Sequence, residues 1–284
     1  MNRRRDLGTN SSPSPRPSPA GRGRSNCPIF AIVKFAVWRQ RMEHSAKSVV
    51  VAAALQDASD ARLMPSRLSG LMTEVKRIYF VTGTDTGAGK TVLTVLLVNH
   101  LRSHGVNAVA LKPVCSGGRS DARRLFAAMD GALPLDEINP WHFRAAIAPS
   151  LAARQEKKKV KLAQAVARIR RRQKKCDVLV VEGAGGLLSP LGEDFNSRDL
   201  IMALGAVPII AAPNRLGVVN HVLLTLEALP KLVRAKARVV LMPQRKPDIS
   251  AKSNASLLAE FFDAGRILNA GGRDFVSKIS QCFL

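Results

Sequence analysis

The chain has 284 residues, a length that allows one large domain or two small ones. Hydrophobic residues make up 46% and charged residues 23%, a composition that excludes a chain disordered throughout. The apolar runs are too short to cross a membrane, so we expect no membrane partner. The four cysteines lie far apart, which argues against a zinc site or a disulfide scaffold and favours a reducing, cytoplasmic location.

The chain is strongly basic, with 44 Lys and Arg residues against 21 Asp and Glu residues and a net charge of +23. Residues 154–175 hold eleven of the basic residues and one acidic residue, Glu156. Such a charge favours nucleic-acid binding in general, but no aromatic residue for base stacking lies within this segment. We therefore interpret the segment as a solvated helix face, with attraction of anionic substrates or RNA as the alternative.

The composition changes near residue 72. Residues 1–25 are dominated by Pro, Ser, Gly and Arg, which cannot form a core. We interpret residues 1–71 as a disordered or spurious leader, with an organellar transit peptide as the alternative. The predicted domain spans residues 72–262, and residues 263–284 form a tail that is diverged or truncated.

Short apolar runs alternate with helical patterns through the rest of the chain. In order, the sequence predicts strand 77–82, helix 91–103, strand 106–111, helices 120–129 and 162–172, strand 177–181, helix 197–204, strand 207–212, helix 218–229, strand 238–242 and helix 251–262. Strands that are apolar throughout and alternate with helices indicate an α/β protein, with a parallel sheet covered by helices on both faces.

A glycine-punctuated segment, GTDTGAGKT (83–91), lies between the first strand and the first helix. Its glycines let backbone N–H groups surround a phosphate, whose charge the helix N-terminus also favours. In such a loop Lys90 can reach the β- and γ-phosphates of a nucleotide, and the hydroxyl of Thr91 can bind Mg²⁺. Gly83 stands one position earlier than in the strict pattern, so a glycine-rich turn is the alternative to a phosphate loop.

Three further polar residues follow predicted strands or open a helix. Lys112 and Glu182 each follow a strand, and Asp121 lies at the start of a helix. Because the carboxyl ends of parallel strands line the ligand crevice, we expect Lys112 and Glu182 beside the phosphate loop. Thr91, Asp121 and Glu182 together offer the oxygen ligands that Mg²⁺ prefers. The alternative for Lys112 is a solvated lysine at the end of a strand. The alternative for Asp121 is a helix cap, and the alternative for Glu182 and the glycines after it is a tight turn.

Seven segments occur in an order that a phosphate loop alone does not require. They are VTGTDTGAGKT (81–91), LKPVCSG (111–117), SDARRL (120–125), INPWHF (138–143), APS (148–150), VEGAGGLLSPL (181–191) and RLGVVNH (215–221). Together they resemble the dethiobiotin synthetase family of P-loop ATP-dependent ligases. Other ATPases of this class share the loop but lack the Lys-Pro-Val and Asn-Pro-aromatic segments, so the combination is more specific than the loop.

The resemblance implies a reaction in which 7,8-diaminononanoate, CO₂ and ATP give dethiobiotin, ADP and phosphate in biotin synthesis. One substrate amine captures CO₂ as a carbamate, the carbamate oxygen attacks the γ-phosphate, and the second amine closes the ureido ring. The resemblance implies that Lys90 and Lys112 are catalytic and that Mg²⁺ binds Thr91, Asp121 and Glu182.

The resemblance also implies which other residues bind the substrates. Those implied to bind ATP are Thr86, Gly87, Ala88, Gly89, Lys90, Thr91, Val92, Asp121, Glu182, Gly183, Ala184, Gly185 and Gln244. Those implied to bind the diamine are Ser116, Leu216, Gly217 and Asn220. The segment 216–220 would serve the neighbouring subunit of a homodimer with shared active sites.

The chain departs from the family near the adenine. Met242-Pro243-Gln244 stands where the family often has an Asn that contacts the base, and Gln244 is the candidate substitute. A partition- or switch-type ATPase that binds a macromolecule through the basic helix is the main alternative function. An inactive relative that has lost nucleotide binding is the second.

Overall fold

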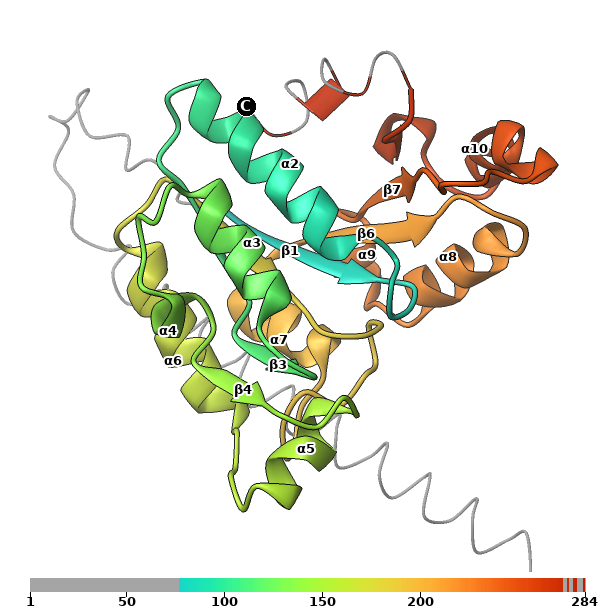
Figure 1. Cartoon of the computed structure of the whole chain (residues 1–284). Coiled ribbons are helices and arrows are strands. Elements are labelled where there is room, and N and C mark those ends of the chain that lie inside the picture. The colour runs from blue at the N-terminus through green and yellow to red at the C-terminus, as the bar shows by residue number, and fades with distance from the viewer. Residues whose placement is uncertain (1–76, 273–274, 276–277, 280–282, 284) are drawn as a thin grey trace, which may run out of the picture. The chain divides into compact units, whose positions relative to one another are not determined.

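The computed structural model describes residues 77–272, 275, 278–279 and 283 (Figure 1). The predicted leader and the predicted start at Met72 lie outside these residues. The strands of the main sheet are β1 (Arg77–Gly83), β2 (Ala108–Leu111), β5 (Val178–Glu182), β6 (Val207–Pro213), β7 (Arg238–Met242) and β8 (Ile267–Asn269). Within the described part of the chain they form a six-stranded, fully parallel sheet in the order β2-β5-β1-β6-β7-β8.

Helices connect these strands and cover both faces of the sheet. They are α2 (Lys90–Ser103), α3 (Ser120–Ala128), α4 (Leu135–Ile138), α5 (Pro149–Gln155), α6 (Leu162–Gln173), α7 (Ser197–Leu204), α8 (Val218–Glu227), α9 (Lys231–Arg234) and α10 (Asn254–Ala259). The connection from β1 to β2 crosses the sheet in one direction, and the connections from β2 to β5, from β5 to β6 and from β6 to β7 cross it in the other. Because crossovers between parallel strands are right-handed, α2 lies on one face of the sheet and α6, α7 and α8 lie on the other. Figure 1 shows α2 and α3 together in front of the strands. The predicted α/β class is confirmed.

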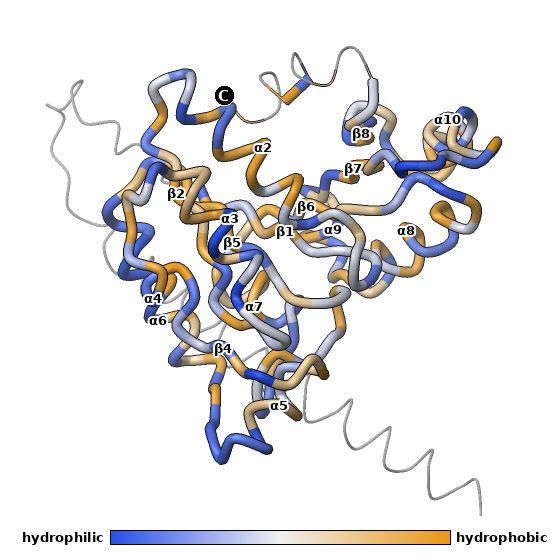
Figure 2. The backbone as a smooth tube through the Cα atoms, in the orientation of Figure 1, coloured by the Kyte–Doolittle hydropathy of each residue, from blue (hydrophilic) through white to orange (hydrophobic). Residues whose placement is uncertain are grey.

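Burial follows from this arrangement, because each central strand has helices on both sides. Figure 2 shows hydrophobic residues along the strands of the sheet. All five residues of β5 are buried, including its terminal Glu182. In the part of the chain that the structure describes, no helix is both long enough and apolar enough to span a bilayer.

A short parallel ribbon outside the main sheet was not predicted from the sequence. Its strands are β3 (Val114–Ser116) and β4 (Trp141–Phe143), which pair in register from Val114 opposite Trp141. The ribbon begins two residues after Lys112, and the backbone N–H of Lys112 donates to the carbonyl of Ile138 (2.9 Å). The chain that leaves β2 is thereby fixed on both sides of Lys112.

The structure shifts the ends of several predicted helices, and the last predicted helix changes most. Helix α3 begins at Ser120 as predicted and ends at Ala128, one residue earlier than predicted, with Arg119 at the N-cap position. The predicted helix 251–262 is shorter, since α10 covers Asn254–Ala259 and a 3₁₀ turn at Ile249–Lys252 precedes it. Asp248 caps that turn by accepting from the N–H of Ser250 (3.0 Å).

The end of the domain also lies later than predicted. Strand β8 pairs with β7 beyond residue 262, and its Leu268 is 1% exposed. Further along, the ring of Phe283 packs edge-on against Tyr79 of the central strand, with centroids 4.9 Å apart. Part of the predicted tail therefore belongs to the sheet and its core.

If β8 is part of the core, truncating its buried side chain must destabilise the protein. Leu268→Ala is expected to lower the free energy of unfolding by about 2–5 kcal/mol, measured by urea unfolding. Leu257→Ala is the matched control, because this α10 side chain is 43% exposed, and its cost should stay within about 0.5 kcal/mol. Equal stability of the two variants would contradict this assignment of β8.

Candidate active site

The carboxyl ends of β1, β2 and β5 border a cavity of about 690 Å³. Its lining comes from the phosphate loop, the ribbon, the start of α3 and the loops after β4 and β5. The lining residues are Thr86, Gly87, Ala88, Gly89, Lys90, Thr91, Val92, Lys112, Cys115, Ser116, Asp121, Arg124, Ala146, Ile147, Ala148, Pro149, Ala184, Gly185, Ser189 and Pro190. The crevice therefore lies where an open α/β sheet places its ligands.

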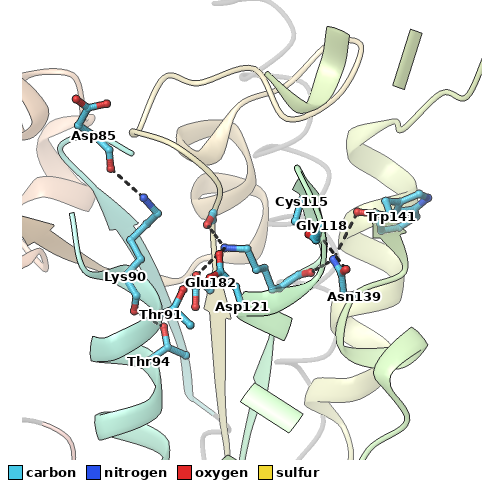
Figure 3. A network of polar contacts seen from close by, with 12 residues as sticks. Asp85, Lys90, Thr91, Thr94, Cys115, Gly118, Asp121, Asn139, Trp141 and Glu182 are labelled. Atoms are coloured by element: carbon cyan, nitrogen blue, oxygen red, sulfur yellow. Dashed lines mark hydrogen bonds and ion pairs between the residues drawn. The ribbon is translucent and has the colours of Figure 1, made fainter. Parts of the chain in front are cut away.

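The phosphate loop adopts a backbone that only glycine accommodates easily. Gly87 and Gly89 have φ of 74° and 90°, in the left-handed region. At Gly83 an added Cβ would lie 2.9 Å from the carbonyl oxygen of Asp85 and 3.1 Å from Nζ of Lys90. A side chain at Gly83 would thus displace the lysine from the loop. Nζ of Lys90 donates to that same carbonyl of Asp85 (2.9 Å), as Figure 3 shows.

Lys90 lies in an environment that weakens its hold on the proton. Burial, together with the nearby positive charge of Lys112, lowers the pKa of Lys90 to about 8. The ammonium is still mostly charged at neutral pH. An anion placed against the loop would favour that charged form further.

A buried ion cluster stands beside the loop. Nζ of Lys112 lies 2.6 Å from Oε1 of Glu182 and 2.9 Å from Oδ2 of Asp121. The hydroxyl of Thr91 donates to the same Oε1 of Glu182 (2.6 Å). Figure 3 shows Thr91, Asp121 and Glu182 side by side, although they come from α2, α3 and β5. The structure thus brings together three residues that the sequence places 30 to 91 positions apart.

The charges of this cluster stabilise one another. Burial alone would lower the pKa of Lys112, but the charges of Glu182 and Asp121 outweigh burial and raise it. Burial would raise the pKa of Asp121, but Lys112 holds that pKa below its usual range. The ammonium and the carboxylate of Asp121 therefore both remain charged at neutral pH.

The cluster offers the ligands that a hard cation needs. Oε2 of Glu182 is buried and accepts no hydrogen bond from the residues that the structure describes. The side chain of Asp121 is 41% exposed, towards the cavity that it lines. Two carboxylates and one hydroxyl fit Mg²⁺, which uses few protein ligands and keeps several waters. This set contains two carboxylates, and the described ranges contain no group of three or more His, Cys, Asp or Glu side chains that could hold a metal ion by themselves.

Asn139 anchors the backbone from which Lys112 extends, a role that the sequence did not reveal. This fully buried amide donates to the carbonyl of Lys112 (2.7 Å) and accepts from Nε of Arg119 (3.3 Å) and from Sγ of Cys115 (3.1 Å). Burial raises the pKa of the Cys115 thiol, which therefore stays protonated. The sequence signal for Asn139 was its place in the INPWHF segment.

The remaining predicted residues divide between the cavity and the surface outside it. Thr86 through Val92 line the cavity, as do Ser116, Ala184 and Gly185. The side chain of Ser116 donates to the carbonyl of Ile147 (2.5 Å). Gly183 lies beneath the lining, where its carbonyl accepts from Lys112 (3.4 Å).

Six predicted residues do not line this cavity: Glu182 and Gly183, which are buried, and Leu216, Gly217, Asn220 and Gln244. Gln244 donates to the carbonyl of Met242 (3.1 Å), and Met242 lies against the phosphate loop at Gly89. The adenine contact of Gln244 stays a prediction. Sequence reasoning also missed two lining residues, Arg124 of α3 and Ser189 of the loop after β5, because it assigned no role to either residue within its segment.

Comparison with known proteins now identifies the family. The AAA domain family matches residues 77–268. The ATP-dependent dethiobiotin synthetase of Anaeromyxobacter sp. (strain Fw109-5) is 46% identical over 157 residues, which cover 54% of this chain and 70% of that protein. The chain belongs to the dethiobiotin synthetase family. The family member from Akkermansia muciniphila is 36% identical over 204 residues, covering 70% of this chain and 95% of that protein.

Among archaeal members of the dethiobiotin synthetase family, the protein of Methanocaldococcus jannaschii is 38% identical over 156 residues, covering 54% of this chain and 73% of that protein. The resemblance drawn from the seven sequence segments is therefore confirmed. A solved structure of hydrogenase maturation factor HypB from Archaeoglobus fulgidus covers 73% of this chain and 89% of its own, at 17% identity and a TM-score of 0.42.

The buried cluster predicts a stability effect as well as a catalytic one. Lys112→Met is expected to lower the free energy of unfolding by about 3–5 kcal/mol, because Glu182 stays buried without its cation. Urea unfolding measures the loss. Adding Glu182→Gln removes the uncompensated charge and should recover part of the stability. Wild-type stability of Lys112→Met would show that the pair is not coupled.

Proposed function

We propose that this chain is an ATP-dependent dethiobiotin synthetase, which forms dethiobiotin, ADP and phosphate from 7,8-diaminononanoate, CO₂ and ATP. The observation that carries the proposal is the convergence of Lys90 and Lys112 on one cavity lined by the phosphate loop. The named relatives favour this activity over a partition-type ATPase. An α/β sheet with a phosphate loop would serve either function, so the relatives decide between them.

The two lysines have different tasks in this mechanism. Lys90 lies in the loop that surrounds the phosphates, where its charge stabilises the transferring phosphoryl group. Lys112 is held at the cavity by two carboxylates, so its ammonium does not have to reorganise when charge develops on the carbamate and phosphate oxygens. The carbamate and the γ-phosphate would meet between these two cations.

We assign Mg²⁺ to Thr91, Asp121 and Glu182. The unpartnered Oε2 of Glu182 and the exposed side of Asp121 support this assignment. When bound, the ion would neutralise charge on the β- and γ-phosphates of ATP. Since Lys112 contacts the same two carboxylates, the protein holds them together without the ion.

We further propose a homodimer in which Leu216, Gly217 and Asn220 bind the substrate of the neighbouring subunit. All three are exposed outside the cavity of their own chain, and they stand where α8 begins. The carboxylate of the substrate lies several carbons from its amines, and the N–H groups of a helix start suit an anion.

A second hollow, of about 440 Å³, supports a second copy of the chain as the occupant of this face. Exposed Leu188 and Leu224 line it together with Asp85 of the phosphate loop. Apolar side chains that border the active-site loop are where a dimer with shared sites would form its contact. We also infer a cytoplasmic location, which the unpaired spacing of the cysteines supports.

The decisive experiment is product analysis with the full chain. Dethiobiotin should form only when the diamine, bicarbonate and ATP with Mg²⁺ are all present, and chelation of Mg²⁺ should stop it. ATP hydrolysis without the diamine and without dethiobiotin would support the alternative of a switch-type ATPase.

Lys90→Ala is expected to lower the turnover number about a hundredfold or more, because one preorganised charge contact to the phosphates is lost. Mass-spectrometric detection of dethiobiotin measures the effect. Lys158→Ala is the matched control, since this lysine pairs with Glu156 on the surface and should leave turnover unchanged. Near-normal turnover of Lys90→Ala would remove Lys90 from the catalytic set.

Complementation tests the shared site. Asn220 is exposed in the first turn of α8, so Asn220→Trp should block the helix start without straining the backbone as a side chain at Gly217 (φ 87°) would. Asn220→Trp and Lys90→Ala subunits should each be inactive alone. Mixed dimers should recover activity, because one of the two composite sites then contains neither change. An inactive mixture after verified subunit exchange would exclude the shared site.

A further inference from the structure

A further hollow, polar and of about 300 Å³, lies beside α6 and shares no lining residue with the active-site cavity. Its lining is Leu111, Glu137, Arg168, Arg171, Arg172 and Lys175, and we call this set the basic pocket. The four cations stand at helical spacings of three and four residues, so they form one stripe along α6 and the turn after it. Figure 1 shows α6 beside α4, which carries Glu137, and Figure 2 shows hydrophilic residues along α6.

Most of the positive charge of the basic pocket is not neutralised by the described residues. Arg172 has the one acidic neighbour, Glu137, at 3.9 Å, and its buried Nε has no hydrogen-bond partner among those residues. Arg168 donates to the backbone carbonyl of Asp136 (3.0 Å), which fixes its guanidinium but supplies no full negative charge. Arg171 and Lys175 form no ion pair with an acidic side chain in residues 77–272. Like charges at this spacing repel one another and destabilise a helix.

We propose that the basic pocket is a binding site for a phosphate-type oxyanion, separate from the active site. Planar guanidinium groups donate pairs of hydrogen bonds to phosphate oxygens, and three arginines here converge on one hollow. Arg168 and Arg172 are half-buried and anchored through α4, so part of the site is preorganised. A bound dianion would remove the repulsion along α6. The group could come from a free inorganic phosphate compound or from a polynucleotide backbone.

Calorimetric titration of the full chain with inorganic pyrophosphate tests the proposal. The titrations use the Lys90→Ala variant, in which the phosphate loop competes less for the probe. Adding Arg171→Glu should weaken pyrophosphate binding about tenfold or more, because a cation of the basic pocket is replaced by an anion. Adding Lys157→Glu is the matched control, since it changes the net charge equally at an exposed residue outside the pocket. Its effect should stay within about twofold.

Two results would overturn the proposal. One is equal affinity of the Arg171→Glu and Lys157→Glu variants, and the other is the absence of saturable binding. Arg171 is exposed, so circular dichroism should show an unchanged fold in both variants.

A second titration identifies the source of the oxyanion. Fluorescence anisotropy with a labelled single strand of about 12 nucleotides, at rising salt, measures binding of a polynucleotide backbone. Loss of that binding in Arg171→Glu alone would support a polynucleotide source. Dependence on Arg171 for pyrophosphate only would support a free phosphate compound.

Discussion

The Lys112–Glu182 contact is the interaction on which the site depends. Both groups are almost fully buried, and the ammonium nitrogen lies 2.6 Å from the carboxylate oxygen, so each charge replaces the hydration that the other loses on burial. The pair also connects the ends of β2 and β5, and Thr91 joins it from α2. The phosphate loop, the carboxylates proposed to bind Mg²⁺ and the lysine proposed as the second catalytic cation are therefore positioned by one buried charge pair.

That pair constrains the surrounding backbone. Lys112 must leave β2 at a fixed angle, and the amide of Asn139 together with the Ile138 carbonyl holds its main chain there. Arg119 in turn donates to Asn139 and to the carbonyl of Leu135 (2.8 Å). The ribbon and α4 therefore serve the site indirectly, because they keep the lysine directed at Glu182.

Five of the six strands of the main sheet could be predicted from sequence because they are short, apolar runs between recognisable helices. The phosphate loop and Glu182 were predictable for a related reason, since their chemistry stands directly after such strands. The ribbon was not, because three-residue strands such as β3 show no period and pair only through tertiary contacts. Strand β8, which also has three residues, was missed for the same reason. Arg124 and Ser189 were missed because only the fold brings their segments to the cavity.

The distribution of charge separates the two polar sites physically. Leu111 lines the basic pocket and the next residue, Lys112, lines the active site, so the end of β2 divides them. In the active site each buried cation has a carboxylate or a carbonyl within 3 Å, where water and salt screen little. In the basic pocket Arg171 and Lys175 face solvent, where dissolved ions screen their field within about 8 Å at physiological ionic strength. Anion binding at α6 should therefore weaken steeply as the salt concentration rises, whereas the contacts within the Lys112 cluster should not change. Ionic strength is therefore the variable that distinguishes one site from the other.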